Sequence, residues 1–358
     1  MMKPPSIRVD GCTITPDSLP TWHQEQNGIR AELGRFLDEW WSPEPTLRLQ
    51  TSGSTGKPTE IQASKAAMRA SAAATCRFFN LSAEHSALLC LPMRYIAGKM
   101  MVVRALECGL NLITTEPCST PLDNLQQSID FAPMVPMQVS STLAQPGGAS
   151  QLSRVRTLLL GGGFVDATLE EQLQNHPCRV FCSYGMTETL SHIALRAING
   201  PARSELYTPL PGVRLWLSPA GTLQLSVPYL GLDSLCTNDL AEINTDGRFR
   251  ILGRADAVIN SGGIKIQAEE LEHSLHQKTG LRVLALPHPH PRLGQCVALL
   301  WEGPAEAEAD LRAACAALPR YHQPHLVYHT RLPLTESGKP ARARAADLLT
   351  RLHANHDD

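Results

Sequence analysis

A short run rich in hydroxyl side chains and glycine, residues 51–59 (TSGSTGKPT), constrains this chain more than any other stretch. Glycine lets backbone N–H groups come close to an oxyanion, hydroxyl groups add further donors, and lysine adds positive charge. The composition therefore predicts a loop that closes over a polyphosphate. The residues expected to bind phosphate are Thr51, Ser52, Gly53, Ser54, Thr55, Gly56 and Lys57.

Two other kinds of loop share this composition. A P-loop of the kinase or GTPase type has four residues between its glycines, and its lysine opens a helix. Here Gly53 and Gly56 are only three apart and Pro58 follows Lys57. A solvated Ser/Gly linker is the second alternative. The order of the residues and the Lys-Pro ending argue against it.

Length and composition set the broad class. The chain has 358 residues, a length sufficient for two domains and a sizeable core. Of these residues, 43% are hydrophobic and 18% are charged. The formal net charge of −2 gives no electrostatic basis for binding nucleic acid or an anionic membrane. The sequence shows no apolar run long enough for a membrane span and no signal-peptide core at its start, so we expect a cytoplasmic protein.

The ten cysteines are scattered, and none forms a C-x-x-C pair. Several of them, such as Cys90, lie in apolar runs. We therefore expect buried, reduced thiols and neither a zinc site nor a disulfide framework. The segment His288-Pro-His-Pro291 has histidines at alternate positions, but its prolines favour an extended turn over a metal site.

Two predicted strands end in turns that suit a nucleotide. Strand 154–160 leads into three glycines at its carboxyl end. Ligands of parallel α/β sheets bind at the carboxyl ends of the strands. The alternative is a glycine-rich turn that binds no ligand. The strand that starts at residue 179 ends in a turn with a carboxylate, and Mg²⁺ prefers such hard oxygen ligands. The candidates are Gly161, Gly162, Gly163, Tyr184, Gly185, Thr187 and Glu188, with Glu188 as the metal ligand.

Four blocks of the sequence, at 51–59, 184–188, 239–272 and 333–342, follow one another in an order that resembles the adenylate-forming enzymes. This superfamily includes acyl- and aryl-CoA ligases, luciferases and the adenylation domains of peptide synthetases. The resemblance implies an α/β fold. Residues 1–255 would form a large N-terminal domain of parallel and mixed sheets with helices, with a shortened N-terminal subdomain. Residues 256–358 would form a small, mobile C-terminal α+β domain.

The resemblance also implies roles for single residues. Adenine would lie on the glycines at 161–163 and against Tyr184. Asp239 would accept hydrogen bonds from both ribose hydroxyls, and Arg254 would contact the ribose or a phosphate. Asp256 would be the hinge, and the loop that begins at Ser261 would swing toward the site for thioester formation. The catalytic residues implied are Lys339, Thr187 and Glu188.

Within the superfamily, the chain most resembles a short-form o-succinylbenzoate–CoA ligase of menaquinone synthesis. The similarity rests on residues 91–104, 135–138 and 184–196. Tyr95 occupies a position that is usually histidine. The acyl pocket implied by the resemblance contains Tyr95, Lys99, His192 and Arg196, although a histidine such as His192 is more often a surface or structural residue.

The implied reaction uses ATP, Mg²⁺, a small carboxylic acid and CoA. The acid would first form an acyl-adenylate with release of pyrophosphate, and CoA would then displace AMP. Two alternatives are an enzyme that loads another acid or a carrier protein, and a degenerate nucleotide-binding protein. The presence of Lys339 and Glu188 argues against the degenerate protein.

Overall fold

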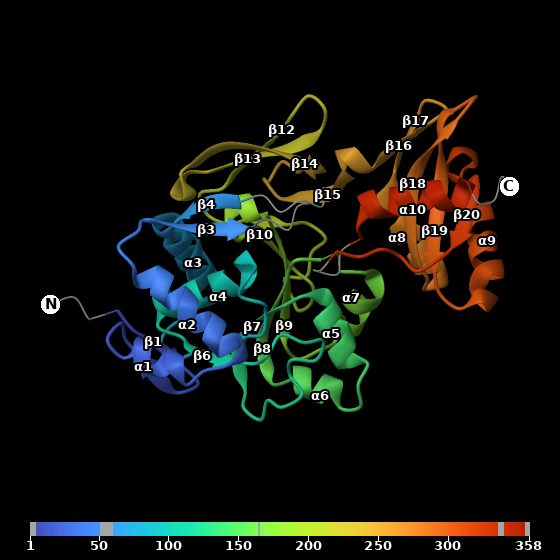
Figure 1. Ribbon diagram of the computed structural model, residues 1–358. Coiled ribbons are helices and arrows are strands. Elements are labelled where there is room, and N and C mark those ends of the chain that lie inside the picture. Colours follow the sequence, from blue (N-terminus) through green and yellow to red (C-terminus); the bar gives the residue numbers. More distant parts are fainter. Residues whose placement is uncertain (1–4, 51–59, 164, 336–339, 355–358) are drawn as a thin grey trace.

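The computed structural model describes residues 5–50, 60–163, 165–335 and 340–354, and Figure 1 shows their arrangement. The glycine-rich run at 51–59 lies outside these residues, but the strands on either side of it are described. Strand β3 (Thr46–Gln50) pairs antiparallel with β4 (Glu60–Ser64). A P-loop connects a strand to a helix. The run at 51–59 connects the two strands of a hairpin instead, which excludes the P-loop arrangement.

The chain up to residue 209 is organised around a nine-stranded sheet with the order β11-β10-β9-β8-β7-β5-β6-β1-β2. Neighbouring strands from β9 to β1 are parallel, and β1–β2, β9–β10 and β10–β11 are antiparallel pairs. The strands are β1 (Ile7–Val9), β2 (Cys12–Ile14), β5 (Ser86–Leu89), β6 (Asn111–Thr114), β7 (Ile129–Met134), β8 (Val155–Leu160), β9 (Arg179–Gly185), β10 (His192–Ala197) and β11 (Thr208–Pro209). The predicted α/β class is confirmed.

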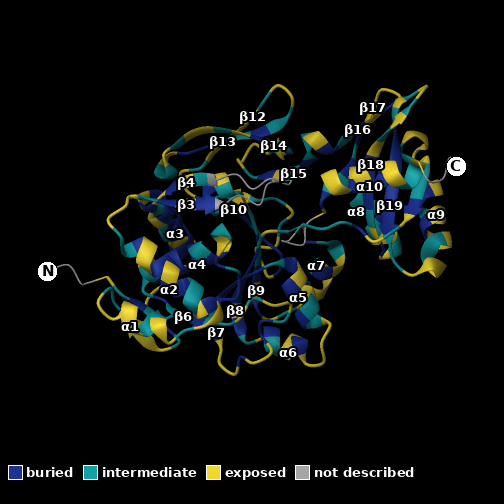
Figure 2. Ribbon diagram, viewed as in Figure 1, coloured by how far each residue is buried: buried dark blue, intermediate teal, exposed yellow. Residues whose placement is uncertain are grey.

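Helices cover both faces of this sheet, and the strands between them are mostly buried (Figure 2). Adjacent strand residues point to opposite faces. The helices are α1 (Leu19–Gln24), α2 (Gly28–Trp41), α3 (Lys65–Phe79), α4 (Ile96–Cys108), α5 (Pro136–Leu143), α6 (Gly148–Leu152) and α7 (Ala167–Gln174). In β5, Leu89 packs into the core beneath α2, α3 and α4, whereas Leu88 packs into the core beneath α5, α6 and α7.

Local sequence signals explain where α3 and α4 begin and end. The hydroxyl group of Ser64 accepts a hydrogen bond from the backbone N–H of Ala67 and caps α3. Helix α4 ends at Gly109, whose φ of +69° is the left-handed conformation that glycine adopts at such ends. Among the described residues, no helix combines the length and apolar character needed to cross a membrane.

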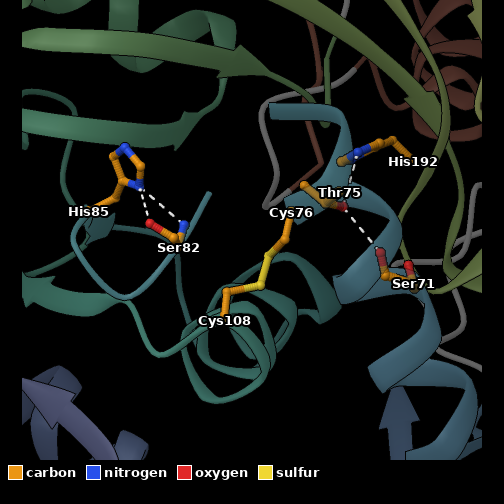
Figure 3. The surroundings of a disulfide bond; sticks show 7 residues. All are labelled: Ser71, Thr75, Cys76, Ser82, His85, Cys108 and His192. Atoms are coloured by element: carbon orange, nitrogen blue, oxygen red, sulfur yellow. Dashed lines mark hydrogen bonds between the residues drawn. A yellow bond between two sulfur atoms is a disulfide. The ribbon is translucent and has the colours of Figure 1, made fainter. Parts of the chain in front are cut away.

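The expectation that all cysteines are reduced is wrong for one pair. Cys76 on α3 and Cys108 on α4 form a disulfide, with their Cα atoms 6.7 Å apart (Figure 3). The other eight cysteines are free. The paired cysteines are 32 residues apart in sequence and meet only because α3 and α4 pack side by side. No spacing rule along the chain could have shown this contact.

Two further sheets follow the large one. An antiparallel sheet contains β12 (Arg214–Leu217), β13 (Thr222–Val227), β14 (Leu232–Ile243) and β15 (Phe249–Arg254). The last sheet contains β16 (Val258–Ser261), β17 (Ile264–Gln267), β18 (Arg282–His290), β19 (Gly294–Glu302) and β20 (Leu326–His329), packed with α8 (Ala268–Thr279), α9 (Glu308–Ala316) and α10 (Arg342–Ala354). Its two hydrophobic clusters consist only of residues after 256, and Figure 1 shows this part at one side of the molecule.

The histidine–proline segment near residue 290 is a strand end rather than a turn. Strand β18 continues to His290, opposite Gly294 of β19. Pro287 and Pro289 have no N–H to donate, but β18 is an edge strand and its alternate backbone positions face away from β19. Within the described part of the chain, no three His, Cys, Asp or Glu side chains gather as a metal site.

Candidate functional site

The carboxyl ends of three parallel strands meet at one edge of the large sheet. Strand β7 ends at Met134, β8 at Leu160 and β9 at Gly185. The backbone N–H of Gly161 donates to the carbonyl of Met134 over 3.2 Å, so the glycines at 161–163 lie directly beside the end of β7. Gly162 has a φ of +73°, which favours glycine at this turn. The glycine turn therefore presents bare backbone at the edge where parallel α/β sheets bind ligands.

Strand β9 passes through Gly185 into a short 3-10 turn, Thr187–Thr189. The hydroxyl of Thr189 accepts from the backbone N–H of Met186 over 3.0 Å and stabilises the turn. A Cβ atom added to Gly185 would lie 2.3 Å from the carbonyl oxygen of Ser191, so only glycine fits. Glu188 is exposed, and its carboxylate has no hydrogen bond or ion pair with any described residue. It is therefore available to a ligand.

Tyr184, Asp239 and Arg254 come together from three different strands. The hydroxyl of Tyr184 donates to a carboxylate oxygen of Asp239 over 2.6 Å, and the guanidinium of Arg254 lies 3.5 Å from the other oxygen. Asp239 and Arg254 are direct partners in the register of β14 and β15. Burial, together with the nearby Asp239, raises the pKa of Tyr184, so its hydroxyl keeps its proton and stays a donor. The sequence did not predict this hydrogen bond.

Arg254 also binds the residue predicted to be the hinge. Its Nε and one terminal nitrogen each donate to Asp256 over 2.9 Å in a two-pronged pair. This pair raises the pKa of Arg254 and lowers that of Asp256, so both stay charged at neutral pH. The backbone N–H of Arg254 donates to Glu269 of α8 over 3.0 Å. One residue thus links the Asp239 site to the start of the last sheet.

Four side chains form a buried series of hydrogen bonds on the face of the large sheet that α3 and α4 cover. The guanidinium of Arg104 on α4 donates to the hydroxyl of Ser191, which lies 3.4 Å from Nδ1 of His192. Nε2 of His192 lies 3.2 Å from the hydroxyl of Thr75, which donates to the carbonyl of Ser71 over 3.2 Å. Since Thr75 gives its proton to Ser71, it accepts from His192, and the imidazole carries its proton on Nε2. All donors in this series of hydrogen bonds therefore point from Arg104 toward Ser71.

Within this series of hydrogen bonds, the only charged side chain is that of Arg104. Burial and the nearby Arg104 hold the pKa of His192 well below its ordinary value of 6.5, so the ring is neutral at pH 7. Arg104 is 3% exposed, and burial lowers its pKa to about 10, still far above neutral pH. Its Nε has no hydrogen-bond partner, and no carboxylate of the described residues pairs with it. Sequence reasoning missed Arg104, although a lone arginine in the apolar stretch 100–105 was a usable signal.

The predicted acyl-pocket residues are divided between two faces of the sheet. Gly185 is opposite His192, but Tyr184 is opposite Ala194, so a bulge shifts the register by one residue. The bulge turns Arg196 away from His192 and toward α7, where it pairs with Glu170. The pairing leaves Arg196 without a free charge for a substrate.

Lys99 and Tyr95 lie at the start of α4. The Nζ of Lys99 is 3.4 Å from the carbonyl oxygen of Arg48 and 6.0 Å from the centre of the Phe36 ring. Burial lowers the pKa of Lys99. Tyr95 is half-buried just before the helix, with the guanidinium of Arg94 4.9 Å from the centre of its ring. Lys99 thus contacts β3 two residues before that strand ends and leads into the glycine-rich run.

The profile of one enzyme family, described as AMP-binding enzyme, matches residues 13–219. The chain belongs to the AMP-binding enzyme family. A solved relative, an acyl-CoA synthetase (AMP-forming)/AMP-acid ligase II-like protein from Dyadobacter fermentans, is 35% identical, with a TM-score of 0.63 over 92% of this chain and 97% of the other. The resemblance to adenylate-forming enzymes is thereby confirmed.

Curated relatives of this AMP-binding enzyme are longer proteins. The 2-succinylbenzoate–CoA ligase of Salmonella typhimurium is 28% identical over 66% of this chain and 53% of its own length. That of Haemophilus influenzae is 27% identical over 86% of this chain and 71% of its own. The chain thus spans about half the length of the Salmonella enzyme. The o-succinylbenzoate CoA synthetase of Bacillus subtilis, at 22% identity and a TM-score of 0.71, shows the same fold.

The structure of this AMP-binding enzyme describes most, but not all, of the predicted site residues. The phosphate-binding residues at 51–57 and Lys339 lie outside the described part of the chain. Several of the described candidates gather around two centres: the glycine turn with Tyr184, Asp239 and Arg254, and the Arg104–His192 hydrogen bonds on the α3–α4 face of the sheet. Arg196, which pairs with Glu170, belongs to neither.

Proposed function

We propose that this AMP-binding enzyme is an ATP-dependent acid–CoA ligase that acts on an aromatic dicarboxylic acid of the o-succinylbenzoate type. The observation that carries this proposal is the buried guanidinium of Arg104, which has no carboxylate partner among the described residues. The names of the Salmonella and Haemophilus relatives support the same substrate class.

The charge of Arg104 favours an acid with two carboxylates. A buried unpaired cation is costly, and a carboxylate that pairs with it offsets that cost. An acyl-adenylate has already used one carboxylate in its bond to phosphate. The second carboxylate is free to bind Arg104, with its remaining N–H donors, while the neutral His192 adds no competing charge. A monocarboxylic acid would leave Arg104 unpaired.

The first centre is suited to the nucleotide. The carboxylate of Asp239, oriented by the hydroxyl of Tyr184, can accept hydrogen bonds from both ribose hydroxyls. Arg254 is close enough to Asp239 to contact the ribose or a phosphate. The glycines at 161–163 have no Cβ atoms, so adenine can lie directly against their backbone. The hydroxyl groups and Lys57 of the 51–57 run would hold the leaving pyrophosphate.

The proposed reaction has two steps. A carboxylate oxygen of the acid attacks the α-phosphorus of ATP, and pyrophosphate leaves. The thiolate of CoA then attacks the acyl carbon, and AMP leaves. Thr187 would donate to the α-phosphate, and Lys339 would hold the carboxylate against it during the first step. The chain acts by positioning and by stabilising charge rather than through a covalent intermediate.

Mg²⁺ fits this site through Glu188. The carboxylate is exposed, unpaired among the described residues and placed where β9 ends. Mg²⁺ is commonly bound by one or two carboxylates together with substrate phosphates. When bound, the ion would neutralise part of the phosphate charge.

The test is a screen for acid-dependent AMP formation with CoA as acceptor, comparing o-succinylbenzoate with benzoate and straight-chain acids. Arg104→Met should raise the KM for o-succinylbenzoate by about 10²–10³-fold, the scale expected when one partner of a buried charge pair is lost. The matched control is Arg196→Met, which removes the cation already paired with Glu170. It should not change the preference for the dicarboxylate.

Two results would contradict the proposal. If another acid is activated faster, or a carrier protein replaces CoA, the substrate assignment is wrong. If ATP binds but no acid yields AMP, the chain is a nucleotide-binding protein without ligase activity.

A further inference from the structure

The disulfide lies next to the buried series of hydrogen bonds at the acid site. Cys76 directly follows Thr75, the residue that accepts from His192, and Figure 3 shows both on one stretch of α3. Cys108 is the last residue of α4 and lies one helical turn beyond Arg104. The disulfide therefore joins the helix whose Thr75 contacts His192 to the helix whose Arg104 contacts Ser191.

The position of the disulfide determines what it can restrain. Cys76 lies in the last turn of α3 and Cys108 at the end of α4, where helix ends otherwise fray. In the described chain, the side-chain contacts of Thr75 and Arg104 to the Ser191–His192 pair are hydrogen bonds that adjust to small helix shifts. A covalent bond between the helices removes part of that freedom. The acid would then meet an arginine that is already positioned, which lowers the cost of binding.

We propose that Cys76 and Cys108 are a reversible oxidation site, and that their disulfide holds the acid site in its high-affinity arrangement. The statement about affinity rests on the proposed ligase function. The reagent class is a small thiol or its disulfide. The reduced form keeps the fold but lets α3 and α4 move relative to each other, so that Arg104 and Thr75 are less well placed.

The exchange balances as an ordinary thiol–disulfide reaction. Cys108 is half-buried and Cys76 is 5% exposed, so the incoming thiolate attacks the sulfur of Cys108. The S–S bond breaks, and Cys76 leaves as a thiolate that takes up a proton. A second small thiol attacks the mixed disulfide and releases Cys108 as a thiolate, which is protonated in turn. Two small thiols are oxidised to one small disulfide, and the protein gains two electrons and two protons.

Other buried cysteines do not compete for this chemistry. Burial raises the pKa of Cys178 to about 12 and raises that of Cys90 further, so neither forms the reactive thiolate at neutral pH. Cys12 is exposed and lies on β2, far along the sheet from β10, which makes it a suitable control.

The test uses the full chain equilibrated with oxidised or reduced dithiothreitol. Alkylation followed by mass spectrometry should find two thiols that become reactive only in the reduced sample, at positions 76 and 108. The KM for o-succinylbenzoate should be about 5- to 50-fold higher in the reduced form, the usual range of coupling between sites. The KM for ATP should not change. Cys108→Ser should behave as the reduced form in both buffers, whereas Cys12→Ser should respond like the unaltered chain.

Equal KM values for the acid in both buffers would overturn the proposal, as would a parallel change in the KM for ATP. Failure of the ligase assignment is recognised separately, because no acid would then yield AMP in either buffer. In that case hydrogen exchange still decides: amides at 96–108 and 190–193 should exchange faster after reduction. Unchanged exchange there, or free thiols at 76 and 108 in the oxidised sample, would refute the redox site itself.

Discussion

At the scale of single residues, His192 connects the proposed acid site to the stability of the fold. The ring is 6% exposed and neutral in the folded chain, because burial and Arg104 hold its pKa well below 6.5. In the unfolded chain the same ring takes up a proton near pH 6.5. Below that pH the unfolded state binds more protons than the folded state, so stability is lost as the pH falls toward the folded pKa.

Because of this one residue, we expect the free energy of unfolding to fall by about 2 kcal/mol when the pH falls from 6.5 to 5. Urea denaturation at several pH values measures it. His192→Gln, which can still donate to Thr75, should flatten the pH dependence in that range by this amount. His85→Gln is the matched control, since His85 lies at an exposed turn with Ser82 (Figure 3). An equal flattening in both variants would mean that His192 is not the group responsible.

At the scale of elements, the junction between β9 and β10 determines which side chains share a face. Gly185 allows β9 to approach Ser191 closely, and the bulge that follows places His192 and Arg196 on opposite faces. An added methyl group at Gly185 would meet backbone atoms of Ser191 and His192, and backbone atoms cannot rotate away as the end of a side chain can.

Gly185→Ala should therefore destabilise the fold by about 1–3 kcal/mol, the usual cost of overpacking, and should also displace the Ser191–His192 pair. Gly163→Ala is a matched control from the neighbouring turn, because its added Cβ would meet only Pro136 side-chain atoms at 3.3 Å or more. Its stability should change by no more than about 0.5 kcal/mol. Thermal unfolding of both variants is the measurement, and similar losses would contradict this account of the junction.

At the scale of the whole molecule, the proposed hinge joins two separately packed parts. Arg254 and Asp256 form an ion pair at this hinge, and the side chain of Asp256 is 55% exposed. An exposed pair contributes no more than about 1 kcal/mol, so it can open when the last part of the chain turns. The segment that carries Lys339 is held at its base by the pairing of Leu334 with Pro340 and by the bond from Ala341 to Pro333. Arg342 then donates to the carbonyl of Ala285 on β18 over 3.0 Å and to Glu272 on α8. Lys339 would therefore move together with the last sheet.

If the last part of the chain turns between the two steps, Lys339 can serve only one of them. Lys339→Ala should slow acyl-adenylate formation by about 10²–10³-fold, the scale for losing one positioned transition-state partner. With preformed acyl-adenylate and CoA, the same variant should make thioester at close to the normal rate. Single-turnover assays of each half-reaction measure both rates. Equal impairment of the two steps would rule out domain alternation.

The hinge variant should show the opposite pattern. Asp256→Pro restricts the backbone at 255–256 and should slow thioester formation more than adenylation. Asp256→Ala is its control, because it also removes the ion pair with Arg254 but leaves the backbone free. If the alanine variant slows thioester formation as much as the proline variant does, the ion pair rather than the backbone rotation matters.

The sequence alone determined the elements and the order of the motifs. The strand predicted at 154–160 is β8 (Val155–Leu160), and the strand predicted to start at residue 179 is β9 (Arg179–Gly185), because apolar runs and the turns that end them are local signals. The α/β class and the family were also readable, since both depend on the order of short motifs along the chain. The presence of Tyr184, Asp239 and Arg254 as candidates came from the same kind of pattern.

Only the tertiary structure decided which of these residues meet. The bulge in β10 separates Arg196 from His192, and helix packing brings Cys76 to Cys108 and Arg104 to Ser191. Residue type and spacing carry no information about these contacts. They arise when elements far apart in sequence bury their apolar faces against one sheet, and side chains on the same helices are then carried into contact with distant strands.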